Sequence, residues 1–402
     1  MTRKILVSLV AIAMMVLLIS CASETEAPTA PNAPDRGTLD IVEDVFFDTL
    51  AVPPISTDEN YFVYRPAGYD ADRAEGYPVV YMLHGFGGNE YYFSGLFDAT
   101  KVLDKLMDEG EVDPMILVFP SSNNAFGGNF YTDSDHRAVG NAMQHIVAIQ
   151  EEVDANYNTI DDRAGRGLCG ASMGGYGAIR MAEMHNDVFG SASMHAAPLT
   201  FDGAGQEYLG VQSLLPAMLA ETGYDTVLAN TGGVGDSTAF VNMMYPTADR
   251  TLTSFVFAAS AAWSPTVVPV ESSIIAFADG TPVGVDLPFG YDGQLYDPTW
   301  QRWLDFDPLD SKNNFAVLAN LANTQLYFDA GSGDNLGFNY AHDVFMGILG
   351  TVVGLGANIH IGTENGTYSP LENSLGADIP ADHTTQTFSR LEGMLKFHND
   401  QF

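Results

Sequence analysis

Apolar runs alternate with amphipathic segments along most of the chain, and this alternation predicts its elements. Short runs that are apolar throughout are typical of strands buried on both faces of a parallel sheet, and here they occupy residues 78–83, 115–119, 167–170, 189–194, 324–328 and 357–361. Apolar residues at helical spacing occupy residues 96–109, 136–156 and 174–185, and again the C-terminal segment. Two further segments rich in β-branched and aromatic residues, 39–50 and 60–65, predict early strands. Strands that alternate with helices predict βαβ units and a mostly parallel sheet covered on both faces.

The N-terminal segment has a different pattern. Arg3 and Lys4 precede an apolar run over residues 5–19, which is short for a transmembrane helix and typical of a secretory signal. The run ends at Cys21 and resembles the lipobox of bacterial lipoproteins, which implies removal of residues 1–20 and lipidation of Cys21. An ordinary signal peptide that happens to contain a cysteine is the alternative. The Pro-containing segment 21–37 predicts an extended tether.

These features predict a lipid-anchored protein of the cell envelope, which in an organism with two membranes would sit in the outer one. The membrane is then a partner only through the N-terminal lipid. Acidic residues outnumber basic ones by 51 to 16, so the formal charge is −35. This charge excludes nucleic acid as a partner, because a phosphate backbone would be repelled. Cys169 is the only cysteine besides Cys21, so we expect no intramolecular disulfide in the mature chain.

Candidate chemistry lies at the turn after the predicted strand 167–170. The sequence Gly170-Ala-Ser172-Met-Gly174 joins that strand to an Ala-containing helix. A Gly-x-Ser-x-Gly in this context predicts a nucleophile elbow, in which a sharp turn exposes the serine hydroxyl at the carboxyl edge of the sheet. The glycines are needed because the turn leaves no room for side chains at those positions. Ser172 is therefore the candidate nucleophile.

A glycine-rich loop follows another predicted strand, 78–83, and reads His84-Gly-Phe86-Gly-Gly-Asn89. Free backbone N–H groups in such a loop can stabilise an oxyanion, together with the N–H of the residue after the nucleophile. This predicts Phe86 and Met173 as the oxyanion donors. A phosphate-binding loop is the competing interpretation, but the loop lacks the Lys-Ser/Thr ending and any nearby basic residue.

Taken together, four segments resemble the esterase family of α/β-hydrolases that includes S-formylglutathione hydrolases, feruloyl and acetylxylan esterases, enterochelin esterases and mycolyltransferases. The segments are 66–69, 77–85, 129–133 and 170–178. The resemblance implies an α/β-hydrolase fold over residues 38–402, with a mostly parallel central sheet. It also implies serine esterase activity through a triad that follows the chain order Ser, acid, His.

The resemblance assigns the remaining triad residues. The family places its acid after a strand in a Gly-x-x-Asp turn, which corresponds to Asp334, with Asp329 as the alternative. Its base precedes the final helix, which corresponds to His383, with His342 and His360 as rivals. The early histidines 84, 136 and 145 precede the nucleophile and are expected to be structural, as is His398. No metal ion or organic cofactor is expected, since the sequence lacks a His/Cys ligand cluster.

Residues 200–308 are longer than a βαβ connection requires and contain all three tryptophans. They predict a cap insertion over Ser172, whose aromatic residues either select the substrate or form the cap's own core. The expected substrate is a small-molecule or glycan-linked ester with a carbohydrate or phenolic component. Acyl transfer on the same triad and a catalytically decayed surface binding lipoprotein are the alternatives.

Overall fold

The structure, a computed structural model, describes residues 36–42, 60–202, 214–247, 249–266, 283–331, 333–361, 367–368, 371–372, 378–379, 383 and 388–402. The predicted signal peptide 1–20, the tether up to residue 35 and the proposed lipidation site Cys21 lie outside the described residues. Among the residues described, no helix is both long and apolar enough to span a bilayer.

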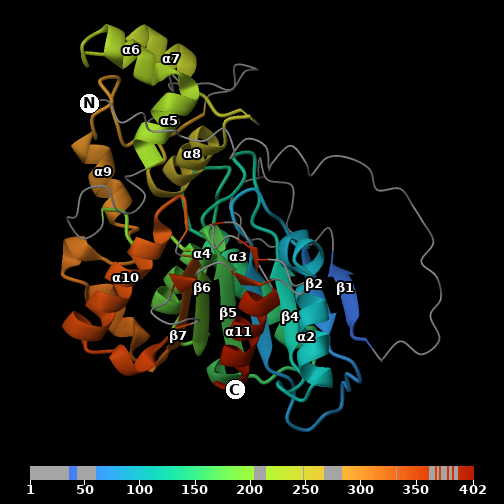
Figure 1. Ribbon diagram of the computed structural model, residues 1–402. Coiled ribbons are helices and arrows are strands. Elements are labelled where there is room, and N and C mark those ends of the chain that lie inside the picture. The colour runs from blue at the N-terminus through green and yellow to red at the C-terminus, as the bar shows by residue number, and fades with distance from the viewer. Residues whose placement is uncertain are drawn as a thin grey trace. The chain divides into compact units, whose positions relative to one another are not determined.

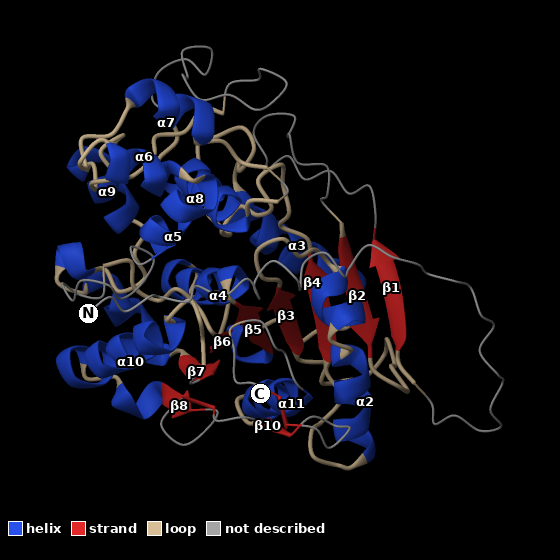
Figure 2. Ribbon diagram, turned by 45° about the horizontal axis from the view of Figure 1, so that its top comes forward, coloured by secondary structure: helices blue, strands red, loops and turns tan. Residues whose placement is uncertain are grey.

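A largely parallel β-sheet forms the centre of the unit that spans residues 37–402 (Figures 1 and 2). Its strands follow the order β1-β2-β4-β3-β5-β6-β7-β8, with β9 pairing alongside β7. The pairs β1–β2 and β2–β4 are antiparallel, and every other pair in this sheet is parallel. The strands are β1 (Thr38–Val42), β2 (Tyr61–Arg65), β3 (Val79–Leu83), β4 (Ile116–Pro120), β5 (Arg166–Ala171), β6 (Ser191–His195), β7 (Gln325–Gly331), β8 (Ile359–Ile361) and β9 (Thr367–Tyr368). A separate hairpin pairs β10 (Leu371–Glu372) with β11 (Asp378–Ile379).

Helices cover both faces of the sheet, as the uniformly apolar strands predict. All five residues of β3 are buried, with Val79 and Tyr81 in one core and Val80 and Met82 in the other. The first core includes helices α3, α4 and α10, and the second includes α2 and α11. These helices are α2 (Ala99–Asp108), α3 (Ala142–Asn156), α4 (Met173–Met184), α10 (Phe338–Ile348) and α11 (Phe388–Asn399). Short 3₁₀ or π stretches occupy Tyr92–Leu96, Arg163–Gly165, Ser311–Asn313, Ala316–Asn323, Leu349–Val353 and Gly356–Asn358. The predicted α/β-hydrolase fold is confirmed.

The predicted helix 136–156 begins later than its apolar spacing suggests. Residues 134–140 form turns instead, in which the carbonyl of His136 accepts hydrogen bonds from Val139 and Gly140. The Asp133 carboxylate then accepts from the backbone N–H groups of Met143 and Gln144 and so caps the first turn of α3. Local side-chain bonding therefore decides where this helix starts.

The described part of the insertion 200–308 is helical. It contains α5 (Leu214–Thr222), α6 (Tyr224–Asn230), α7 (Ser237–Met243), α8 (Thr251–Trp263) and α9 (Asp297–Leu304). Figures 1 and 2 show these helices grouped together beside the edge of the sheet from which α4 starts. The ring of Phe255 in α8 packs at 5.4 Å from Phe86, in the loop after β3, and at 5.0 Å from Phe130, in the loop after β4. The insertion therefore packs on loops at the carboxyl ends of the strands.

The tryptophans join the insertion to the α/β body rather than standing in solvent. Trp263 and Trp303 are fully buried and lie 5.0 Å apart between ring centroids. Trp263 also packs against Phe130 at 4.7 Å and against Tyr176 of α4 at 5.4 Å. These contacts favour a core role over substrate selection, but the core is shared with the α/β body and is not the cap's own.

Candidate active site

Ser172 occupies a strained turn between β5 and α4. Its backbone has φ 54° and ψ −116°, a conformation that costs an L-residue about 1–3 kcal/mol. A Cβ atom at position 174 would lie 1.9 Å from the carbonyl oxygen of Leu83, and one at Gly170 would lie 2.1 Å from the carbonyl oxygen of Gly174. The Ser172 N–H donates to the carbonyl of His195 at 2.8 Å, which fixes the turn to the next strand. The two flanking glycines are thus a steric requirement of this turn.

His383 joins Ser172 to Asp334. Its Nε2 atom lies 2.9 Å from the Ser172 hydroxyl oxygen, and its Nδ1 atom lies 3.1 Å from Asp334 Oδ2. The imidazole is largely buried and packs edge-on against the ring of Phe338 at the start of α10. The structure therefore brings together all three residues predicted as a triad, although the sequence separates the serine from the histidine by 211 positions.

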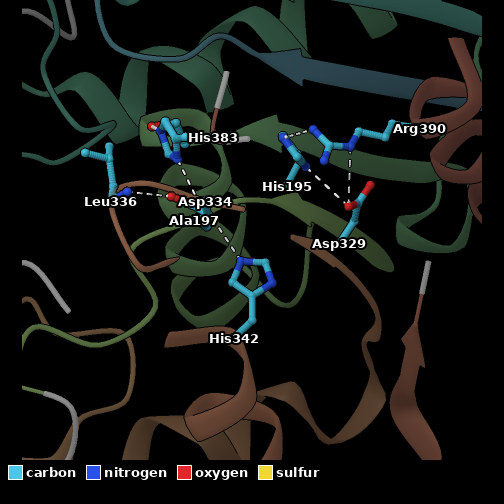
Figure 3. Close-up of polar contacts among 9 residues, drawn as sticks. His195, Ala197, Asp329, Asp334, Leu336, His342, His383 and Arg390 are labelled. Carbon is cyan, nitrogen blue, oxygen red and sulfur yellow. Dashed lines mark hydrogen bonds and ion pairs between the residues drawn. The ribbon is translucent and has the colours of Figure 1, made fainter. Parts of the chain in front are cut away.

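Asp334 is held as a hydrogen-bond acceptor by its own loop. It lies between β7 and α10, and its Oδ1 atom accepts from the backbone N–H of Leu336 at 2.8 Å (Figure 3). Burial by itself raises the pKa of this carboxyl, but the hydrogen bond and the charge attraction from His383 outweigh it and lower the pKa below its usual value. The carboxylate is therefore ionised at neutral pH and able to orient the imidazole.

The rival acid and bases lie elsewhere. Asp329 is buried near the end of β7 beside His195 and Arg390, not beside His383. The Nε2 atom of His342 accepts a hydrogen bond from the backbone N–H of Ala197, and burial lowers its pKa to about 3. His360 pairs with the side chain of Gln325 at 2.9 Å.

The predicted oxyanion donors flank the nucleophile turn. Phe86 lies in the loop after β3, where the Gly87 N–H donates to the carbonyl of Gly127 at 2.7 Å. Met173 is the first residue of α4, so its N–H has no partner within the helix. In the described part of the chain, neither of these two N–H groups donates to another backbone carbonyl outside the helices and strands.

The early histidines stabilise loops around the site. His84 Nε2 accepts from the Ser122 N–H at 2.8 Å, which ties the loop after β3 to the loop after β4. Burial lowers the pKa of His84 to about 4, so its ring is neutral and can act as this acceptor. His136 Nε2 bonds to the carbonyl of Val283 in the insertion, and His398 lies between the hydroxyls of Ser191 and Ser193.

Two residues near the triad were missed by the sequence analysis. His195 ends β6, and Arg390 lies in the first turn of α11; both are buried. His195 carried one available signal, because it directly follows the predicted strand 189–194, the next predicted strand after the one that leads to Ser172. Cys169 is buried in β5, and burial raises its pKa to about 12, so it remains a thiol. In the described ranges no group of three or more His, Cys, Asp or Glu could hold a metal ion.

Comparison with known proteins identifies the family of the chain. Residues 54–339, more than half of the chain, match the family described as "Putative esterase". The chain belongs to this esterase family.

Among curated relatives, the esterase is 34% identical to an esterase of Mycobacterium tuberculosis over 125 residues, which are 30% of this chain and 25% of that protein. It is 29% identical over 136 residues to the "Endo-1,4-beta-xylanase/feruloyl esterase" of Xylanibacter ruminicola, covering 32% of this chain and 18% of that one. The matched segment thus spans a quarter or less of these relatives.

Solved structures with a similar chain course include a ferulic acid esterase, at 16% identity and a TM-score of 0.49, with 92% of this chain and all of that chain covered. Another is the S-formylglutathione hydrolase of Staphylococcus aureus, at 12% identity and a TM-score of 0.46, with 91% and 98% covered.

Proposed function

We propose that this esterase is a serine carboxylesterase that works through an acyl-enzyme, with Ser172 as nucleophile, His383 as general base and Asp334 as the orienting acid. The observation that carries the proposal is the placement of one imidazole within hydrogen-bond distance of both the Ser172 hydroxyl and the Asp334 carboxylate. Nucleophile, base and orienting group in this order form the arrangement that serine acyl transfer requires.

The mechanism follows from the protons that each group holds. His383 Nδ1–H donates to Asp334, so Nε2 carries the lone pair and takes the proton of Ser172 as its oxygen attacks the ester carbonyl. The N–H groups of Phe86 and Met173 stabilise the resulting oxyanion, and each such donor contributes about 10²–10³-fold in rate. His383 then protonates the leaving alcohol, and afterwards it activates the water that releases the acid.

The substrate class is part of the proposal. The relatives' names include a feruloyl esterase, and the oxyanion-loop residue Phe86 packs against Phe255 of the insertion. Aromatic rings packed at the proposed oxyanion loop suit a small or aromatic acyl group. We propose acylated carbohydrates or phenolic esters as substrates, and the formal charge of −35 disfavours polyanions.

The experiment combines turnover with covalent labelling of the full-length protein. Purified protein hydrolysing p-nitrophenyl acetate and methyl ferulate, and labelled by a fluorophosphonate at Ser172, would support the proposal. Ser172→Ala should lose about 10⁴–10⁶-fold in kcat and all labelling, whereas Ser254→Ala, a hydroxyl that donates to the carbonyl of Thr247 in the insertion, should retain both. A folded wild type with neither turnover nor label would refute the proposal and favour a binding protein. Product in excess of hydrolysis when an acceptor alcohol is added would instead indicate acyl transfer.

The cellular location is a separate proposal, carried by the charged and apolar segment that ends at Cys21. We propose that lipidated Cys21 anchors the esterase in the cell envelope. Cys21→Ala should move the protein from the membrane fraction to the soluble fraction, while Ser20→Ala should leave it membrane-bound. An unchanged membrane fraction for Cys21→Ala would refute the lipid anchor.

A further inference from the structure

A second buried polar cluster lies next to the triad and shares no residue with it (Figure 3). It consists of His195, Asp329 and Arg390, each no more than 1% exposed. An Arg390 Nη1 atom lies 2.9 Å from His195 Nε2, His195 Nδ1 lies 3.4 Å from Asp329 Oδ1, and Arg390 Nε lies 3.7 Å from the same oxygen. Charged groups buried this deeply are costly unless they compensate one another.

The cluster is tied to the nucleophile turn through the sheet. Ala171, His195 and Asp329 are register partners across β5, β6 and β7, so they lie side by side at the carboxyl ends of three strands. The carbonyl of His195 accepts from the Ser172 N–H at 2.8 Å, and that of Asp329 accepts from Ala196 at 2.8 Å. A displacement of the His195 backbone would therefore also displace the backbone of Ser172.

Arg390 connects the same cluster to the base. It lies in the first turn of α11, the helix that follows His383, and α11 packs with α2 on one face of the sheet. Arg390 reaches from that helix to the ends of β6 and β7. The buried guanidinium thus fixes the start of α11, the helix that follows His383 in the chain.

The hydrogen bonds define the protonation of His195. A guanidinium can only donate, so His195 Nε2 must be an unprotonated acceptor and the ring proton sits on Nδ1, facing Asp329. Burial first, and then the Arg390 charge, hold the pKa of His195 below its usual value. The cluster therefore contains one positive charge, one negative charge and a neutral imidazole.

We propose that Arg390 and His195 are positioning residues of the esterase site. They fix the turn of Ser172 relative to the helix after His383, and Arg390 neutralises the charge of Asp329 beside the triad. This inference rests on the proposed function. Neither residue is bonded to the proposed reacting groups; each acts through the backbone of Ser172, through the start of α11 or through its charge.

The charge balance gives a signature that a general loss of structure would not produce. The groups that act electrostatically on His195 are Arg390 from α11, Asp329 from β7 and His383. Those that act on His342 from α10 are His195, Asp329, Asp334 and His383. Removing the Arg390 charge leaves the Asp329 carboxylate uncompensated, which favours the protonated base and should move the acidic limb of activity to higher pH. Removing the Asp329 charge leaves Arg390 uncompensated and should move that limb to lower pH.

The test compares pH profiles of kcat/KM for full-length Arg390→Gln, Arg390→Lys, Asp329→Asn and the double variant Arg390→Gln/Asp329→Asn. The acidic limb reports the pKa of the base in the free enzyme. Arg166→Gln is the matched control, because Arg166 is also a buried, ion-paired arginine but lies at the opposite end of β5 from Ser172. Thermal unfolding of each variant establishes that it is folded.

We expect Arg390→Gln to lower kcat/KM by about tenfold or more and to move the acidic limb to higher pH by on the order of half a unit. Asp329→Asn should move the acidic limb to lower pH, and the double variant should return the limb to its wild-type position. Arg390→Lys should leave the limb at its wild-type position but lower kcat/KM. Arg166→Gln should leave both kcat/KM and the position of the acidic limb unchanged. The inference would be overturned if the acidic limb stayed in place in folded Arg390→Gln and Asp329→Asn, or if it moved in the same direction in both variants.

The test of the cluster can fail without the proposed esterase function failing, and the two failures give different results. An inactive wild type would refute the esterase proposal, whereas an active wild type with unshifted variants would refute only the role of the cluster. Nitrogen NMR of the imidazoles reads the His195 tautomer without any turnover. A proton on Nε2 of His195 would overturn the inference irrespective of activity.

Discussion

Replacing Asp334 by Asn tests the acid assignment most directly, because the structure predicts which way the new amide must point. Asp334 Oδ1 accepts from the Leu336 N–H, and that backbone donor still needs an acceptor in the variant. The Asn carbonyl oxygen would take this role, which leaves the NH₂ group facing His383 Nδ1. An NH₂ group can only donate, so His383 must switch to the tautomer with its proton on Nε2, pointing at Ser172.

A protonated Nε2 cannot accept the serine proton. We therefore expect Asp334→Asn to lower kcat by about 10⁴-fold, which corresponds to about 5.5 kcal/mol of lost transition-state stabilisation. Asp334→Ala should also lose activity, but without enforcing the wrong tautomer. Asp329→Asn is the comparison variant: Asp329 lies on the same strand-to-helix segment but pairs with His195 and Arg390 rather than with His383, so its loss of kcat should be much smaller.

The assay is initial-rate hydrolysis of p-nitrophenyl acetate by the purified full-length variants, together with the second-order rate of fluorophosphonate labelling. Both quantities depend on the same base, so they should fall together. If Asp334→Asn kept more than a tenth of the wild-type kcat, or if Asp329→Asn fell as far as Asp334→Asn, the assignment of Asp334 would be wrong.

Three further predictions concern the elements around the triad. Gly174→Ala should abolish folding or activity, because its Cβ would lie 1.9 Å from the Leu83 carbonyl oxygen; soluble, active protein in gel filtration and hydrolysis assays would contradict the elbow geometry. Burial raises the pKa of Glu183 to about 8 and that of Asp307 to about 7, so the folded protein retains protons that the unfolded chain releases near pH 4. The contribution of these two carboxyls to the free energy of unfolding should therefore fall as pH rises from about 4 to 8, and the stability of Glu183→Gln relative to wild type in thermal melts should increase over this range. Trp263→Ala should cost about 3–5 kcal/mol of stability in urea titrations, because it empties a core shared by the insertion and α4; a loss below about 1 kcal/mol would mean that the two parts are not coupled through this residue.

The local features of the site were predictable because short-range sterics and patterning determine them. Strands β3 to β7 coincide with their apolar runs to within a few residues, since burial on both faces requires uninterrupted apolar residues. Gly170 and Gly174 could be interpreted from the sequence because the backbone of a strand-to-helix turn excludes a Cβ atom whatever the rest of the fold does. The order of the strands and the family resemblance then limited the base to the histidines after β7.

The tertiary structure alone decided between chemically equivalent residues. Asp329 and Asp334 are five positions apart and both follow an apolar run, yet only Asp334 reaches His383, which lies 49 positions further on. Contacts over such separations depend on how the sheet and α11 pack, and no local pattern encodes them. The burial of Trp263 and the pairing of Arg390 with His195 follow from the same packing. The sequence by itself thus determined the elbow and its candidate partners, and packing between distant elements determined which partners meet.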